Sequence, residues 1–326
     1  MALDIDTFID RRQMRRKLSF WRVGALLAIA VALIAVLASA GAFKNIGKPS
    51  QHIARVPING IITEDKPLLK MLEKITKDDT VKGVVLSIDS PGGTTVGGEA
   101  IYEAVRKIAK DKPVVTSVGT LAASAGYMIA SASDHIVARR SSIVGSIGVI
   151  FQYPQAVDLL DKIGVDVKEI KSSPLKAEPS PFNPTPPEAV VAIQELVDDS
   201  YGWFVDLVTE RRPLNRAEVL KVADGRVFSG NRSLNLKLID AVGGEEVAKE
   251  WLVKEKGLDK DLKIVDWKPK RESGSLLFGN TALGWLADQL GLGTNRPEAM
   301  IPEELHKRLF LDGLLSIWHG ETGAAK

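Results

Sequence analysis

The segment VVLSIDSPGG, Val84 to Gly93, is followed after 28 intervening residues by AASAGYMIAS, Ala122 to Ser131. The apolar start of the first segment is typical of a buried strand, and its Ser-Pro-Gly-Gly end indicates a tight turn. The second segment places Ser124 between small residues, directly before a run that can be helical. Together the two segments predict strands that end in turns, with helices between them.

The same alternation extends over most of the chain and predicts an α/β core with largely parallel strands. The strand-like ranges are Ile53–Ile58, Gly83–Ile88, Pro113–Val118, His135–Ala138 and Val165–Ile170, and the helix-like ranges are Leu68–Ile75, Val96–Ala109, Ala125–Ser131 and Gln155–Ile163. A Thr-x-x-Glu capping box at Thr185–Glu188 predicts the start of a long helix that ends near Arg212.

Ser124 is the candidate nucleophile for acyl transfer. Such a serine must be exposed at a sharp turn, and backbone N–H groups must point at the oxygen that becomes negative. The N–H groups of Gly93 and Ala125 are the candidate donors, because glycine lets the backbone come close to a substrate. Taken alone, each segment is also compatible with a plain turn and with a serine that only packs.

The sequence predicts that the base for Ser124 is a lysine rather than a histidine. The chain has 4 histidines, and none lies in a Gly- or Ser-rich turn, so a Ser-His-Asp triad is not expected. A lysine amine that burial keeps neutral is the other solution. Lys176 fits this role because it lies in KSSPLKAEPSPFNPTPPE, Lys171 to Glu188, where prolines restrict the backbone.

Five separated motifs carry a family resemblance, and it covers roughly residues 50 to 250. They are DSPGG, ASAGYMIAS, VGSIGVI, PLKAEPSPF and ADGRVFSG, in this order from Asp89 to Gly230. In order and spacing they resemble the signal peptide peptidase A family, in its short, single-copy form. The resemblance implies a serine peptidase on a spiral α/β core of the crotonase and Clp-protease kind. No internal repeat is evident, as the short form requires.

The resemblance also implies roles for individual residues. It makes Ser124 and Lys176 a catalytic dyad, gives Ser146 the role of orienting the lysine amine, and makes Gly93 an oxyanion donor. It further implies a homo-oligomer whose active sites can be shared between subunits, with peptides such as cleaved signal peptides as substrates. Two positions depart from the family pattern: Ala125 replaces a frequent glycine, and Lys237 replaces a usual one.

Residues 23–43 form a run of 21 uncharged residues between Arg22 and Lys44. As a helix this run would span about 31 Å, close to the thickness of a bilayer core. Because six basic residues precede it, we expect a single-pass anchor in the inner (cytoplasmic) membrane, with a cytoplasmic N-terminus and a periplasmic or extracytoplasmic catalytic domain. Cleavage after Ala40 is the main alternative, and a buried soluble helix is a second.

The expected organisation is therefore a basic N-terminus over 1–22, an anchor over 23–43, a linker over 44–52, a peptidase domain over 53–267 and an amphipathic tail over 268–326. The tail has apolar faces that suit packing on the core, a subunit contact or the membrane surface. The net charge of +2 gives no reason to expect nucleic-acid binding. The chain has no cysteine and no clustered His/Asp spacing, so we expect no metal and no other cofactor.

Two other functions fit parts of the pattern. A crotonase-like acyl-CoA enzyme would use the same oxyanion hole with carboxylate acid-base groups, so it would not depend on Lys176. A non-catalytic scaffold for peptides or partners would need none of Ser124, Lys176 and Ser146.

Overall fold

The computed structural model describes residues 20–33, 35–36, 51–270 and 315–317. The chain divides into two units, Met1–Ser50 and Gln51–Lys326. In the first unit, residues 20–33 and 35–36 are helical, and their large apolar side chains are exposed. Among the described residues, no helix has both the length and the apolarity to cross a membrane. The expected anchor over 23–43 lies partly outside the described residues, and so does most of the tail over 268–326.

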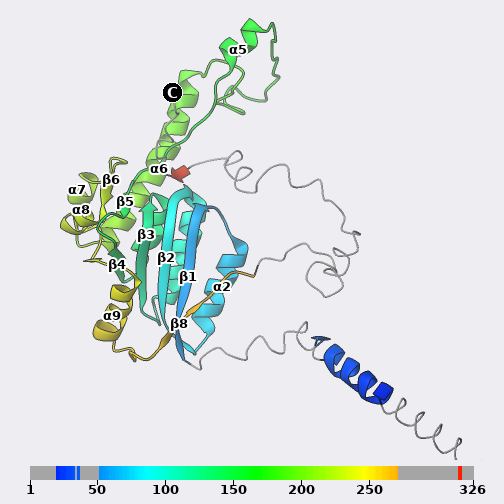
Figure 1. The fold of residues 1–326 in the computed structure, drawn as a ribbon. Coiled ribbons are helices and arrows are strands. Elements are labelled where there is room, and N and C mark those ends of the chain that lie inside the picture. Colours follow the sequence, from blue (N-terminus) through cyan, green and yellow to red (C-terminus); the bar gives the residue numbers. More distant parts are fainter. Residues whose placement is uncertain (1–19, 34, 37–50, 271–314, 318–326) are drawn as a thin grey trace, which may run out of the picture. The chain divides into compact units, whose positions relative to one another are not determined.

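The second unit is built on one sheet in which most neighbouring strands are parallel (Figure 1). Its central strands follow the order β6-β5-β3-β2-β1-β8, β4 joins β3 to β7, and β9 pairs with β2. Only the β5–β6 and β2–β9 pairs are antiparallel among the described strands. The strands are β1 (His52–Ile62), β2 (Val81–Thr94), β3 (Val114–Ala123), β4 (His135–Ala138), β5 (Ile143–Gly145), β6 (Val227–Ser229), β7 (Ala241–Val242), β8 (Lys263–Asp266) and β9 (Leu315–Ile317).

The helices connect and cover these strands, as the alternation in the sequence predicts. They are α2 (Lys66–Lys77), α3 (Thr95–Ile108), α4 (Ala125–Ser131), α5 (Val157–Lys162), α6 (Pro187–Arg211), α7 (Arg216–Leu220), α8 (Gly230–Asn235) and α9 (Glu245–Lys256). The α/β core with a largely parallel sheet is therefore confirmed.

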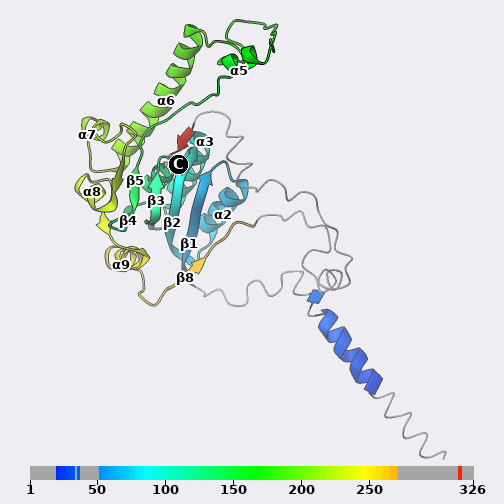
Figure 2. The same ribbon diagram turned by 45° about the horizontal axis from the view of Figure 1, so that its top comes forward.

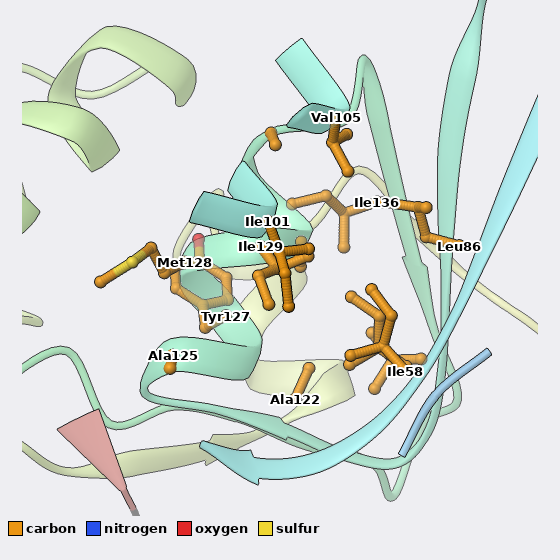
Figure 3. Packing of buried hydrophobic residues seen from close by; sticks show 14 of the residues in the cluster. Ile58, Leu86, Ile101, Val105, Ala122, Ala125, Tyr127, Met128, Ile129 and Ile136 are labelled. Atoms are coloured by element: carbon orange, nitrogen blue, oxygen red, sulfur yellow. The ribbon is translucent and has the colours of Figure 1, made fainter. Parts of the chain in front are cut away.

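Helix α4 lies inside the hydrophobic core, and all seven of its residues are buried. Figure 3 shows its side chains Tyr127 and Ile129 packed against Ile101 of α3, with Ile58 of β1 and Ile136 of β4 close by. Burying a side chain of this size contributes about 1.5–3 kcal/mol. Ser124, which directly precedes α4, is thus held between the buried helix α4 on one side and β3 on the other.

Three local predictions from the sequence are wrong. Val165–Ile170 forms no strand, and the Ile170 side chain is fully exposed. The Ser-Pro-Gly-Gly segment is not a turn but part of β2, which runs on to Thr94. The expected capping box of α6 is absent, since the N-cap is Pro186 and has no side-chain cap.

A projecting arm carries the segment between β5 and the middle of α6. Figures 1 and 2 both show α5 and the loop after it standing away from the sheet on the N-terminal half of α6. We call residues 155–197 the arm. Its exposed large apolar side chains are Leu159, Ile163, Val165, Ile170, Leu175, Phe182, Val190, Val191 and Leu196. Apolar surface of this extent is typical of a face that binds a partner.

Candidate active site

Ser124 lies at the junction of β3 and α4, where the backbone turns sharply from strand to helix. Its φ and ψ are 56° and −119°, a conformation that a non-glycine residue adopts only when its surroundings enforce it. The amide of Ser124 donates to the Gly145 carbonyl at 2.8 Å, and its carbonyl accepts from the Met128 amide at 2.9 Å. A strained serine between a strand and a helix is the geometry of a nucleophile elbow.

Ser146 lies beside Ser124 because the strands that precede them are paired. Ala123 at the end of β3 is in register with Gly145 at the end of β5. Ser146 follows Gly145, has a φ of 52°, and its amide donates to the Arg226 carbonyl at 2.8 Å. Two serines in unusual backbone conformations therefore leave two neighbouring strands at the same sheet edge, and both are buried.

Gly93 is packed directly against β1. A Cβ atom at this position would lie 1.8 Å from the Ile62 carbonyl oxygen, so only glycine fits. The part of β2 before it is held in place by Ser90, whose hydroxyl donates to the Gly60 carbonyl at 2.6 Å and accepts from the Gly92 amide at 3.1 Å. Beyond its place in the motif, no sequence signal pointed to Ser90. Its role became visible only with the two hydrogen bonds.

Ala125 is the first residue of α4, and its side chain is fully buried. The first N–H groups of a helix have no acceptor inside the helix, so this amide suits an oxyanion donor. Ser90 also lies between the segments that carry the two candidate donors, Gly93 on β2 and Ala125 on α4. It pairs with Ala122 of β3, and its carbonyl oxygen would lie 3.0 Å from a Cβ added at Gly126. The close approach of β2 to α4 thus requires a small residue at position 126.

The structure does not bring Lys176 to Ser124 within one chain. Lys176 is an exposed residue of the arm, whereas Ser124 is fully buried in the core. The loop that carries Lys176 is nevertheless ordered by ion pairs of Lys171 with Glu169 at 2.7 Å and with Glu178 at 2.6 Å. These contacts raise the pKa of Lys171. The hydrogen bond to Lys171 is the main cause that lowers the pKa of Glu178, followed by the bond from the Ser180 amide.

The histidines do not form a catalytic site in the described part of the chain. His135 stacks on Trp251 with ring centroids 4.7 Å apart, and its Nδ1 lies 3.9 Å from an Asp240 carboxylate oxygen. Burial is the main cause that lowers the pKa of His135. His52 is fully buried and accepts a hydrogen bond from the Trp267 indole at 3.0 Å. No group of three or more His, Cys, Asp or Glu side chains suited to a metal occurs among the described residues.

The backbone at Lys237 keeps the conformation expected for the glycine that is usual at this position. Its φ is 59°, in the left-handed region that favours glycine, so the turn before β7 is kept although the residue differs. The carbonyl of Lys237 accepts a hydrogen bond from the Arg212 guanidinium at 2.9 Å.

The buried serine at the elbow lies beside glycine-rich backbone, and sequence comparison identifies the family of this chain. The model of peptidase family S49 matches residues 106–259. A Synechocystis sp. protein provisionally named a protease is 39% identical over 246 residues, which cover 74% of this chain and 88% of that protein. The chain therefore belongs to peptidase family S49, whose members are serine peptidases.

Two further relatives agree with this family. An Enterococcus faecium protein provisionally named signal peptide peptidase SppA is 34% identical over 254 residues, 73% of this chain and 74% of that protein. The chloroplastic serine protease SPPA of Arabidopsis thaliana is 30% identical over 215 residues, which cover 65% of this chain and 30% of that protein. The resemblance inferred from the five motifs is confirmed.

Proposed function

We propose that the protein is a membrane-anchored serine endopeptidase in which Ser124 is the nucleophile and Lys176 of a neighbouring subunit is the general base. The observation that carries the proposal is the strained elbow at Ser124, with the glycine-rich end of β2 beside it. Such an elbow is costly to maintain and is typical of sites where a nucleophile must be presented in one orientation.

The chemistry follows from these groups. Neutral Lys176 takes the Ser124 hydroxyl proton as the oxygen attacks the peptide carbonyl, and the resulting ammonium protonates the leaving amine when the C–N bond breaks. The N–H groups of Gly93 and Ala125 stabilise the oxyanion, and one such donor is worth about 2.7–4 kcal/mol. A water molecule, deprotonated by Lys176, then attacks the acyl-enzyme carbonyl, and the Lys176 ammonium returns the proton to the Ser124 oxygen when the ester C–O bond breaks.

The position of Lys176 supports an active site shared between subunits. A base amine must be shielded from water to stay neutral, yet Lys176 is exposed in the isolated chain. It lies on the arm, whose apolar side chains are also exposed. If the arm packs on a second copy of the chain, both its apolar surface and Lys176 become buried. This arrangement would also form a homo-oligomer.

Ser146 is the proposed positioning residue for the lysine. It lies next to Ser124 at the ends of paired strands, so its hydroxyl is near the place where an incoming amine must be held. A hydrogen bond from the amine to this hydroxyl would orient the amine lone pair towards Ser124.

The substrate and location rest on the N-terminal sequence. A basic flank before 21 uncharged residues favours an anchor with the peptidase domain outside the cytoplasm. Such an anchor raises the local concentration of apolar peptides at the membrane, and we propose residual signal peptides as the main substrates. A reporter fused after Gln51 should be active only outside the cytoplasm, and a soluble mature chain that starts at Gly41 would contradict the anchor.

Labelling with a fluorophosphonate probe tests the catalytic assignment. The intact protein should be labelled, and Ser124→Ala should abolish the label. Ser131→Ala is the matched control, because that serine is the last residue of α4, the helix that follows Ser124, and its hydroxyl donates to the Tyr127 carbonyl. Lack of labelling in correctly assembled protein would favour the non-catalytic scaffold. Full peptidase activity of a Lys176→Ala variant would contradict the assignment of Lys176 as the base. A crotonase-like acyl-CoA enzyme with the spiral core remains the second fold-compatible function, and acyl-CoA turnover would reveal it.

A further inference from the structure

The motif ADGRVFSG, Ala223 to Gly230, has no part in the chemistry proposed above, although it lies beside the site. It forms an exposed turn at residues 224–226 and then β6, which runs antiparallel to β5 (Figures 1 and 2). The pair Gly145↔Val227 ends this ladder at the side of Ser146. The turn of the motif therefore lies directly next to the residue proposed to orient the lysine amine.

Two main-chain hydrogen bonds join the turn to the backbone on both sides of the Ser146 side chain. The Ser146 amide donates to the Arg226 carbonyl at 2.8 Å. The Gly225 amide donates to the Ile147 carbonyl at 3.2 Å. A Cβ added at Gly145 would lie 3.2 Å from the Arg226 carbonyl oxygen, so the residue before Ser146 is also close to the turn. Ser146 has a φ of 52°, which a residue other than glycine keeps only when its surroundings enforce it, and these contacts contribute to that enforcement.

The turn itself is held in one shape. One Asp224 carboxylate oxygen accepts hydrogen bonds from the Arg226 amide at 3.3 Å and from the Arg226 Nε at 2.8 Å, and the other oxygen forms an ion pair with the same guanidinium. Gly225 between them has a φ of 84°, in the region that favours glycine. The Tyr201 hydroxyl of α6 donates to the Ala223 carbonyl at 2.7 Å, which anchors the start of the turn to a long helix.

We propose that the turn at residues 224–226 is a positioning element for the reaction, and that it holds Ser146 where its hydroxyl accepts a hydrogen bond from the lysine amine. The hydroxyl can orient the amine only if its own backbone stays in place, and a displacement of about 1 Å far from the chemistry can cost about 10²-fold in rate. Asp224 and Arg226 touch neither the substrate nor the reacting atoms in this proposal, since they act through Ser146. The inference rests on the proposed peptidase function and adds residues to it.

Two pairs of variants test the turn. Asp224→Ala removes the side chain that closes it. Asp259→Ala is the matched control, because Asp259 also accepts from the amide two residues later, that of Asp261 at 2.9 Å, in an exposed segment before β8. Gly225→Ala strains the backbone of the turn, and Gly257→Ala at the end of α9 is its control. Both glycines have a positive φ, and an added Cβ would have open space at both.

Peptide hydrolysis and hydrogen exchange are measured for all four variants as assembled protein. Asp224→Ala and Gly225→Ala should each lower kcat about tenfold relative to their controls and leave KM unchanged. The fragment that contains Ser146 should exchange faster in these two variants than in the controls. In a Ser146→Ala background, Asp224→Ala should cause no further fall in kcat, because the hydroxyl through which the turn acts is absent.

A fall of equal size in the Ser146→Ala background would overturn the proposal, and so would a kcat or an exchange rate that does not differ from the controls. A higher KM at unchanged kcat would overturn it as well, because the exposed Arg226 side chain would then bind substrate. If the unmodified protein neither hydrolysed peptide nor reacted with the serine probe, the proposed function would fail, whereas the exchange result would still decide whether the turn holds Ser146.

Discussion

The Ser124 amide donates to the Gly145 carbonyl at 2.8 Å, and this bond joins the elbow to β5, the strand that directly precedes Ser146. Because the contact is between backbones, it survives substitution of either serine side chain. The hydroxyls of Ser124 and Ser146 can therefore be removed one at a time without separating β3 from β5.

Ser146→Ala should lower kcat by less than about 10²-fold, because it removes the hydroxyl that orients the lysine but not the nucleophile or the base. Alanine has the same Cβ as serine, so the strained φ of 52° is unchanged. Steady-state kinetics on a peptide substrate measure the effect. A loss as large as that of Ser124→Ala would assign Ser146 a direct part in the reaction.

Ser124→Gly should stabilise the protein while it abolishes hydrolysis. The φ of 56° and ψ of −119° are strained for any residue with a Cβ, and relief of such strain is worth about 1–3 kcal/mol before the extra chain entropy of glycine is subtracted. Ser124→Ala keeps the strain and is the control. Thermal unfolding of the two inactive variants gives the comparison, and a lower melting temperature for the glycine variant would argue against stored strain.

Gly93→Ala should destabilise the fold and remove activity, since the added Cβ would lie 1.8 Å from the Ile62 carbonyl oxygen and would push β2 from β1. Gly202→Ala is the matched control, because it lies inside α6 and its Cβ would meet no atom within 4 Å. The control should be neutral or stabilising by up to about 1 kcal/mol. Denaturant unfolding of both variants checks the contrast.

The sequence predicted the parts of the fold that depend on local pattern. The strand at His135–Ala138 follows from its apolar pattern, the long helix α6 was expected from the Thr185–Glu188 motif, and Ser124 lies at the expected strand-to-helix junction. The strand expected at Val165–Ile170 alternates only as far as Lys168, and no neighbouring strand pairs with it in the described chain. Pairing partners are set by tertiary structure, which periodicity does not contain.

The remaining differences have similar causes. The capping box failed because Pro186 takes the N-cap position, which moves Glu188 one residue closer to the helix start than the motif requires. Strands β5 and β9 have three residues each, too few for a periodic signal. The proximity of Ser146 to Ser124 therefore came from the family resemblance, and the pairing of β9 with β2 could not be expected from sequence.

Protein stability should fall as the pH drops from about 7 towards 5, partly through His135. Burial lowers the pKa of His135 in the folded state below the ordinary value of about 6.5. Below that value the unfolded chain binds the proton first, so the contribution of His135 is complete above the unfolded pKa and decreases as the pH falls through the folded one. His135→Gln should flatten this part of the curve of unfolding free energy against pH. An unchanged slope would show that other groups cause the decrease.

Mixed assemblies test whether the active site is shared. Ser124→Ala and Lys176→Ala chains should each be inactive alone, because the members of one catalytic unit do not act independently. Fifty-one residues separate the two positions in sequence, and the structure places them in the core and on the arm. Co-expression should restore part of the activity, since a contact between unlike chains can contain one intact serine and one intact lysine. Lys168→Ala is the control for the lysine substitution, because Lys168 is also an exposed residue of the arm and should be dispensable. Co-assembled chains without recovered turnover would place both groups of the dyad in one subunit, and the arm would then have to fold back onto its own elbow.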